Sequence, residues 1–206
     1  MTNNHFNTNR SIQDKYTLSS EHQRIVSDVL SRHLQRFNRV TVMRFDLRFP
    51  EYLQWDDTKV ISRFIDAFKS RLSAWNNRRE SGHPIGFGYI WCREQAVGTS
   101  HWHYHVAFMF NKDALFTFGR TEPGADNTYN RIVGAWASAL DIDIGEAIGL
   151  VHVCANGVYW LDQNAPDYGQ TLIDCQYRLS YLTKKETKEI GDGNRHFNAS
   201  QKIFLG

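Results

Sequence analysis

The sequence lacks the features that identify several large classes of protein. Its 206 residues contain no apolar run near the 20 residues that a membrane-spanning helix needs, so we expect no membrane partner. It has only three cysteines, far apart and without a CxxC pair, which favours a reducing compartment over a disulfide scaffold or a zinc knuckle. The polar N-terminal stretch has no apolar segment of the kind that a secretory signal carries. These absences predict a cytoplasmic protein.

An excess of one charge sign is also lacking, because 24 basic side chains face 22 acidic ones and the formal net charge is +2. Such a balance gives no bulk electrostatic argument for a nucleic-acid partner, so any such partner has to be argued from a local site. Apolar residues make up 41% of the chain, with 13 Phe, 9 Tyr and 6 Trp. A chain of this length and composition can bury a core without disulfides or a structural metal.

Periodicity along the chain predicts the order α-β-α-β-β-α-β-α. Apolar residues at helical spacing predict helices that begin at residue 19 and that cover residues 55–79, 127–140 and about 170–188. Alternation predicts strands over residues 39–50, 83–95, 101–111 and 149–161, with a hairpin turn at residues 96–100. This order favours an α+β fold, in which helices cover one face of a largely antiparallel central sheet. We divide the chain into a polar N-terminal arm and helix, residues 1–37, and one domain, residues 38–206.

The segment HWHYHVAF, residues 101–108, is the most informative in the chain. Because side chains alternate along a strand, its three histidines project from one face, with Cα atoms of neighbours about 6.6–7 Å apart. Two imidazoles at that spacing can converge on one divalent ion, and a carboxylate companion favours Mg or Mn. The predicted ligands are His103, His105 and Glu94, with His101 and Asp46 in reserve. The alternative interpretation is a polar, solvent-facing strand surface.

A second group lies on the last predicted helix, where Tyr177, Tyr181 and Lys184 are spaced to share one face. A tyrosine phenol is a poor nucleophile unless a cation lowers the barrier to its attack. Lys184, one turn beyond Tyr181, can supply positive charge to a phenolate or to a phosphate. The alternative interpretation is an amphipathic helix whose tyrosines pack on the sheet and whose lysines are solvated.

Together the two groups resemble the motifs of HUH endonucleases. HYHVAF, residues 103–108, is similar to their His-hydrophobe-His motif, and YLTK, residues 181–184, is similar to their nucleophile motif of Tyr and Lys three apart. Over residues 38–205 the layout resembles inovirus Gp2-type replication initiators and their prophage relatives, the YagK/YfjJ-like group. The similar stretches are RFDLRF, the Arg-Glu before the histidine strand, and LSYLTKKETK. The resemblance implies a core like an RNA-recognition motif and a rolling-circle replication initiator.

Such an initiator nicks one DNA strand, keeps a 5′-phosphotyrosine and leaves a 3′-OH for a polymerase. Carried over by position, the resemblance implies His103 and His105 as ligands of Mg or Mn and Tyr181 with Lys184 as the nucleophile pair. Glu94 matches only by its location. Tyr177 is either a second nucleophile or a structural neighbour, and the lysine spacing favours Tyr181.

The implied partner is single-stranded or origin DNA, lying along the polar face of the sheet. The arginines expected near its phosphates are Arg44, Arg48, Arg93 and Arg178. No GxxxxGK[ST] segment occurs, so a host helicase would have to unwind the DNA and a host polymerase would extend it, in the cytoplasm of a bacterial cell. His152, in LVHVCANG, is interpreted as a sheet histidine rather than as a ligand.

Two other functions compete with this one. A non-catalytic module of the same fold would bind single-stranded nucleic acid without needing a metal. A structural zinc protein is disfavoured because the cysteines are scattered and a closed zinc site usually has four ligands.

Overall fold

The computed structural model describes residues 16–53, 57–80, 82–95, 101–186 and 193–206. Its helices are α1 (Ser20–Arg36), α2 (Val60–Asn76), α3 (Thr128–Leu140), α4 (Ile144–Ala147) and α5 (Tyr168–Ser180). Its strands are β1 (Arg39–Arg48), β2 (Gly88–Gln95), β3 (Trp102–Asn111), β4 (Val151–Asp162) and β5 (Phe197–Ala199). Two short 3-10 helices, η1 (Ile148–Leu150) and η2 (Tyr181–Thr183), lead into β4 and out of α5.

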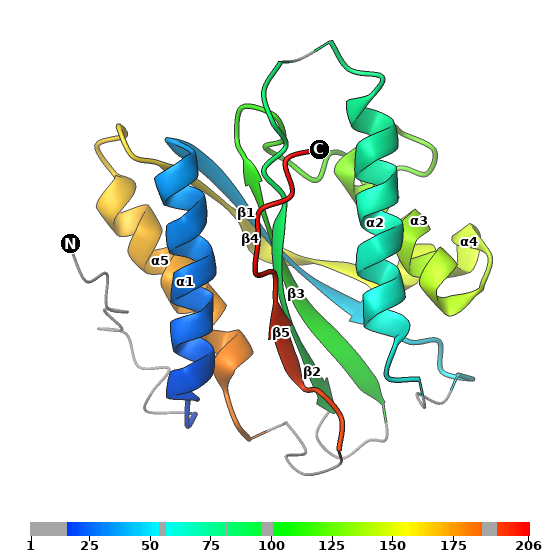
Figure 1. Cartoon of the computed structure of the whole chain (residues 1–206). Helices are drawn as coiled ribbons and strands as arrows, with labels where there is room; N and C mark the ends of the chain where they lie inside the picture. The colour runs from blue at the N-terminus through cyan, green and yellow to red at the C-terminus, as the bar shows by residue number, and fades with distance from the viewer. Residues whose placement is uncertain (1–15, 54–56, 81, 96–100, 187–192) are drawn as a thin grey trace.

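The five strands form one sheet in the order β4-β1-β3-β2-β5, and every neighbouring pair is antiparallel (Figure 1). This confirms the predicted α+β class with an antiparallel central sheet. The ladder between β1 and β4 shifts register between Met43 and Phe45, which marks a bulge in that edge pair. The strands of the predicted hairpin, β2 and β3, do pair, while its turn at residues 96–100 lies outside the described residues.

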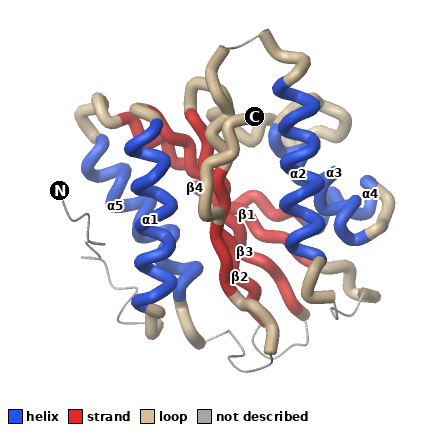
Figure 2. The backbone as a smooth tube through the Cα atoms, viewed as in Figure 1, coloured by secondary structure: helices blue, strands red, loops and turns tan. Residues whose placement is uncertain are grey.

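Helices cover both faces of the sheet, so the prediction of one covered face was wrong. Figure 2 shows α2 and α3 on one side of the strands and α1 and α5 on the other. The reason lies in the first half of β1, where Val40 and Val42 alternate with Met43 and are as deeply buried. They belong to an apolar cluster with residues of α1 and α5, so only the second half of that strand face is polar.

The face under α2 and α3 holds an aromatic core. Phe45 and Phe108 meet edge to face with ring centroids 4.9 Å apart. Phe64 of α2 packs on Phe108, and Trp136 of α3 packs in turn on Phe64. Aromatic side chains bury about 150–250 Å² each, so this cluster carries much of the apolar stabilisation of the fold. The indole N–H of Trp136 donates to the carbonyl of Arg48 at 2.8 Å and so ties α3 to the end of β1.

The last helix is shorter than predicted, ending at Ser180 instead of continuing to about residue 188. The Ser180 hydroxyl donates to the carbonyl of Tyr177 at 2.8 Å, and the Thr183 hydroxyl donates to that of Ser180 at 2.7 Å. Hydroxyl groups that bond to nearby carbonyls compete with the helical ladder. The chain therefore tightens into η2 and is extended at Lys184, and residues 187–192 lie outside the described part.

Other boundaries also differ from prediction. The helix expected over residues 55–79 spans Val60–Asn76, and residues 54–56 lie outside the described part. The short elements α4, η1 and β5 were not predicted, because three or four residues are too few to show a periodic pattern of apolar residues. α1, which we had placed in a separate arm and helix, packs on the sheet in the same apolar cluster as α5. None of the described helices is long and apolar enough to cross a lipid bilayer.

Candidate metal and nucleophile site

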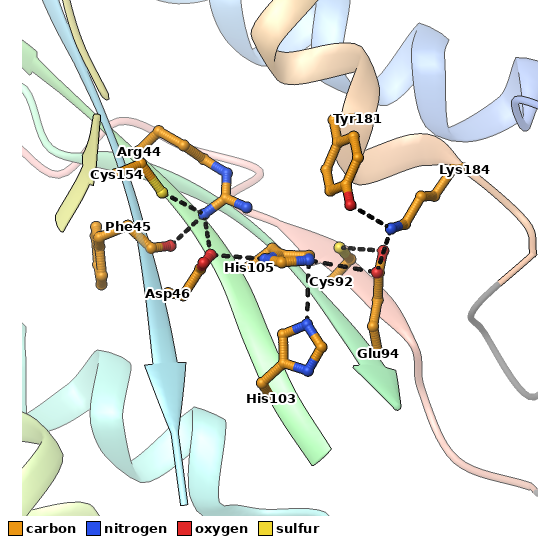
Figure 3. Close-up of polar contacts among 10 residues, drawn as sticks. All are labelled: Arg44, Phe45, Asp46, Cys92, Glu94, His103, His105, Cys154, Tyr181 and Lys184. Atoms are coloured by element: carbon orange, nitrogen blue, oxygen red, sulfur yellow. Dashed lines mark hydrogen bonds and ion pairs between the residues drawn. The ribbon is translucent and has the colours of Figure 1, made fainter. Parts of the chain in front are cut away.

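Three neighbouring strands gather the polar residues of the site on the face that α1 and α5 cover. Asp46 of β1 lies opposite His105 of β3, and His103 lies opposite Glu94 of β2. Residues that oppose one another in an antiparallel ladder project from the same face. The four side chains therefore lie together on one face of the sheet, as Figure 3 shows.

Three of these side chains place ligand atoms close together. Nε2 of His105 lies 3.2 Å from Nε2 of His103 and 3.3 Å from Oε2 of Glu94. The ligand atoms of Glu94, His103 and His105 all lie within 4.8 Å of one another. Burial, and next the proximity of His105, lowers the pKa of His103 to about 4. His103 is therefore uncharged near neutral pH and keeps a lone pair for a cation.

Asp46 stands behind this group rather than in it. Nδ1 of His105 lies 2.6 Å from Oδ1 of Asp46, a bond that leaves Nε2 of the ring facing Glu94 and His103. A carboxylate that bonds the far nitrogen of a histidine orients the ring and raises its basicity as a ligand. Burial raises the pKa of Asp46, but His105 and the adjacent Arg44 lower it more, so the carboxylate stays ionised. The donor set thus fits a divalent cation, with Asp46 in an orienting role.

A second possible group, Asp46, His152 and Cys154, lies on the same face. The guanidinium of Arg44 occupies this position, since its Nη1 donates to Oδ1 of Asp46 and lies 3.7 Å from Sγ of Cys154. Burial raises the pKa of the Cys154 thiol, which keeps it protonated. A fixed positive charge and a neutral thiol disfavour a cation here. This group was not predicted from the sequence, although His152 and Cys154, two residues apart on a strand, could have indicated it.

Tyr181 and Lys184 join the first group from above the sheet. The Lys184 ammonium donates to the Tyr181 hydroxyl at 2.7 Å and lies 2.7 Å from Oε2 of Glu94. Burial lowers the pKa of Lys184, but Glu94 and Tyr181 raise it more, so the side chain stays charged although only 4% exposed. The Tyr181 ring also meets the His105 ring edge to face at 5.5 Å.

These contacts form one continuous chain, which Figure 3 follows from Tyr181 through Lys184, Glu94 and His105 to Asp46. Lys184 keeps positive charge at the phenol oxygen, where a phenolate or a phosphate would need it. Glu94 connects the ammonium to the histidine nitrogens. The arrangement places a tyrosine hydroxyl and a lysine ammonium beside a group of residues that could hold a divalent ion.

The remaining predicted residues lie outside this chain of contacts. Tyr177 is half-buried on α5, four residues before Tyr181, and His101 is exposed ahead of β3. Arg48 is exposed at the end of β1, opposite His103 in the ladder. Arg178 donates to the Tyr159 hydroxyl at 3.3 Å and to the carbonyl of Ala155 at 2.9 Å.

Arg93 does not reach the site at all. It opposes Tyr104 in the β2–β3 ladder, and Tyr104 belongs to the aromatic core on the other face. Its guanidinium stacks 4.1 Å from the ring centroid of Trp102 and the side chain is 1% exposed. Arg44 is also buried and is engaged with Asp46. Of the four predicted phosphate contacts, Arg48 is the exposed one beside the histidines.

Comparison with known proteins adds a family to this geometry. Residues 1–200 match the YagK/YfjJ C-terminal domain family. The chain is 32% identical over 194 residues to YagK of Escherichia coli strain K12, an alignment that covers 88% of this chain and 92% of that protein. It is 31% identical over 198 residues to YfjJ of the same strain, covering 87% and 91%. Both relatives are named as uncharacterized proteins, and no solved structure matches the chain.

Proposed function

The chain belongs to the YagK/YfjJ C-terminal domain family, and from the geometry of its site we propose that it is a metal-dependent nickase of single-stranded DNA. One observation carries the proposal: Lys184 contacts both the Tyr181 hydroxyl and Glu94, each at 2.7 Å, and so joins a nucleophile to a set of metal ligands. The resemblance to HUH replication initiators extends the proposal to rolling-circle replication in a bacterial cell, with a host helicase and polymerase as partners.

Glu94, His103 and His105 would hold Mg or Mn, which when bound polarises a phosphoryl group and neutralises charge that develops on its oxygens. The protein's own residues do the rest. The Tyr181 oxygen attacks phosphorus, and the bond from phosphorus to the 3′-oxygen breaks. The phenol proton ends, in net terms, on that 3′-oxygen, so the products are a 5′-phosphotyrosine and a free 3′-OH.

Lys184 has two tasks in this step. Its ammonium stabilises negative charge on the Tyr181 oxygen as the proton leaves. Its contact with Glu94 fixes the position of the ammonium itself. Asp46 holds the His105 ring so that Nε2 lies near Glu94 and His103, the residues that would hold the ion with it. Arg48, exposed beside His103, is the side chain available to a DNA phosphate at the rim of the site.

A trapping experiment tests the proposal. The full chain is incubated with Mn²⁺ or Mg²⁺ and a pool of circular single-stranded DNA of randomised sequence, and covalent adducts are recovered under denaturing conditions. We expect an adduct that needs the metal, that carries phosphate on Tyr181 by mass spectrometry, and that Tyr181→Phe abolishes. Tyr177→Phe is the matched control and should keep it. An adduct formed by Tyr181→Phe as well as by wild type would rule out this nucleophile.

One observation favours a non-catalytic module that binds single-stranded nucleic acid. Glu94 already has a cationic partner in Lys184, so the site holds together without a metal. Binding of labelled single-stranded DNA in the presence of EDTA separates the two functions. Unchanged affinity in EDTA together with no adduct in Mn²⁺ favours the binding module, whereas a metal-dependent adduct favours the nickase.

A further inference from the structure

A short segment ahead of α1, Tyr16–Ser19, lies against the turn that carries the nucleophile. We call this segment the N-terminal strap. Leu18 and Lys184 form an isolated antiparallel bridge. Backbone hydrogen bonds flank the bridge: Ser19 N–H donates to the carbonyl of Thr183 and Lys185 N–H donates to that of Thr17, both at 2.9 Å. The turn is therefore held by α5 at one end and by the strap along its side.

The aromatic ring of the strap reaches the reacting groups themselves. The Tyr16 ring meets the Tyr181 ring edge to face with centroids 5.8 Å apart. Nζ of Lys184 lies 5.4 Å from the Tyr16 centroid and 3.9 Å from the Tyr181 centroid. An ammonium that lies against aromatic rings is attracted by their negative faces. Tyr16 thus contacts the nucleophile and the cation that would activate it.

The turn needs such support because it has left regular structure. α5 ends at Ser180, η2 covers Tyr181–Thr183, and Lys184 is extended with φ −62° and ψ 148°. Nothing in a helical ladder fixes the direction of the Tyr181 side chain at this point. Since reacting groups misplaced by about 1 Å can lose roughly a hundredfold in rate, a neighbour that restrains the phenol has a large effect on catalysis.

We propose that the N-terminal strap is a positioning element of the active site, and that the Tyr16 ring holds Tyr181 and Lys184 in the orientation needed for attack. The inference rests on the proposed nickase function, because the role of Tyr181 belongs to that function. It gives a role to the segment ahead of α1, which was predicted from the sequence to be a polar arm separate from the domain of residues 38–206.

Single-turnover adduct formation in the full chain is the main test, with Tyr16→Ala and Tyr16→Phe compared with wild type. We expect Tyr16→Ala to lower the rate at saturating DNA roughly tenfold, the effect of losing one cation–π contact and one ring pair, without changing the DNA concentration at half-saturation. Tyr16→Phe keeps the ring and should recover most of the rate. Tyr52→Ala removes an exposed tyrosine that bonds to Glu146 of α4 and serves as the matched control.

A second readout does not depend on activity. Tetranitromethane nitrates accessible tyrosines, and mass spectrometry measures the reaction at Tyr181. We expect faster nitration of Tyr181 in Tyr16→Ala than in wild type or in Tyr16→Phe, because the covering ring is gone. If wild type forms no adduct and Tyr181 nitration still rises in Tyr16→Ala, the nickase proposal fails and the restraint of Tyr181 by the strap stands.

Three results would overturn the proposal. The first is a Tyr16→Ala variant whose adduct rate and Tyr181 nitration both equal those of wild type. The second is a change confined to the half-saturating DNA concentration, which would make Tyr16 a base-stacking contact instead. The third is a Tyr16→Phe variant as slow as Tyr16→Ala, which would assign the effect to the hydroxyl and not to the ring.

Discussion

At Glu94 a single carboxylate contacts both a lysine ammonium and a histidine ring. Its Oε2 lies 2.7 Å from the Lys184 ammonium and 3.3 Å from Nε2 of His105, and the residue is 1% exposed. A carboxylate this deeply buried is stable in its ionised form only if a cation compensates for its lost hydration. Lys184 supplies that compensation in the protein alone, and a metal bound at the histidines would add to it.

Replacing Lys184 by methionine should therefore destabilise the fold as well as the site. Breaking a buried ion pair by removing one partner typically costs about 3–5 kcal/mol, because the other charge is left uncompensated. We expect a loss of free energy of unfolding of that order in Lys184→Met, measured by urea denaturation at pH 8. Addition of Mn²⁺ should restore part of it, since the ion gives Glu94 a new positive partner.

The exposed neighbour Lys185 gives the control for this prediction, because Lys185→Met removes a charge without touching Glu94. The double variant Lys184→Met/Glu94→Gln should be more stable than Lys184→Met alone, since the buried charge is gone. Equal stability of Lys184→Met and wild type in the absence of metal would show that the ion pair between Lys184 and Glu94 does not stabilise the fold.

At the scale of elements, α1 and β2 approach each other with no space between them at Gly88. A Cβ atom built there would overlap Cε1 of the His33 ring and would lie 3.1 Å from the Ser200 hydroxyl. Overpacking a tight contact typically costs about 1–3 kcal/mol. We expect Gly88→Ala to lower the urea midpoint accordingly, whereas Gly82→Ala, where nothing lies within 4 Å of the added carbon, should leave it unchanged.

His33 makes the same contact sensitive to pH. The residue is 1% exposed, its Nδ1 bonds to the carbonyl of Val29 at 2.8 Å, and burial, aided by nearby Arg32, lowers its pKa. The folded state thus resists protonation that the unfolded chain accepts below its ordinary pKa of about 6.5. The contribution of the uncharged His33 to the free energy of unfolding is fully present above that pH. It falls as the pH drops toward the lower pKa of the folded state.

His33→Gln tests this assignment, because glutamine can still donate to Val29 but does not titrate. The free energy of unfolding should fall between pH 7.5 and pH 5.5 in wild type by more than it falls in the variant. Other groups, such as His103, are common to both proteins and cancel in the comparison. An identical pH dependence in the two proteins would show that His33 does not contribute to the pH dependence of the free energy of unfolding.

Long periodic elements could be predicted from the sequence, and their exceptions have local causes. Alternation located β1 and β3, and helical spacing located α2, because each presents enough residues to show a period. The second covered face was not predicted because only the first half of that face of β1, at Val40 and Val42, is apolar, while its second half is polar. The end of α5 was missed because hydroxyl-to-carbonyl bonds at Ser180 and Thr183 stop the helix without a glycine or proline.

The candidate site divides in the same way. Alternation and hairpin pairing placed His103, His105 and Glu94 on one face, and the four-residue span from Tyr181 to Lys184 put the phenol beside the ammonium. The position of Asp46 behind His105 depends on the register between β1 and β3. The contact of Tyr16 with Tyr181 depends on packing between residues that are 165 positions apart in the sequence. Neither relation has a local signal. Their roles in metal binding and catalysis stay predictions.

At the scale of the whole molecule, the net charge is only +2. The candidate site can still contain several charged groups, because each buried cation in it lies beside a carboxylate. Arg44 pairs with Asp46, and Lys184 pairs with Glu94. Neither ion pair therefore contributes strongly to the electrostatic potential far from the protein. In the proposed function, long-range attraction of DNA phosphates would then be weak. We infer that recognition of a particular DNA sequence or structure would contribute more to binding than non-specific charge does.

A metal bound at this site has to stabilise the whole fold, because it binds the folded chain and not the separated ligands of the unfolded one. At a free concentration a hundred times its dissociation constant, a ligand adds about 2.7 kcal/mol of stability. For a chain of this size that corresponds to a rise in Tm of roughly 5–10 °C. We expect such a rise with Mn²⁺ in wild type, measured by differential scanning calorimetry.

Which side chains hold the ion is decided by variants in the two groups. The rise in Tm should disappear in His103→Ala/His105→Ala and persist in His152→Ala, because Arg44 occupies the second group with positive charge. Each variant is compared with itself with and without metal, so a change in its own stability does not affect the result. If the rise persists in the double variant and disappears in His152→Ala, the ion binds at Asp46, His152 and Cys154, and the assignment of the metal to Glu94, His103 and His105 is wrong.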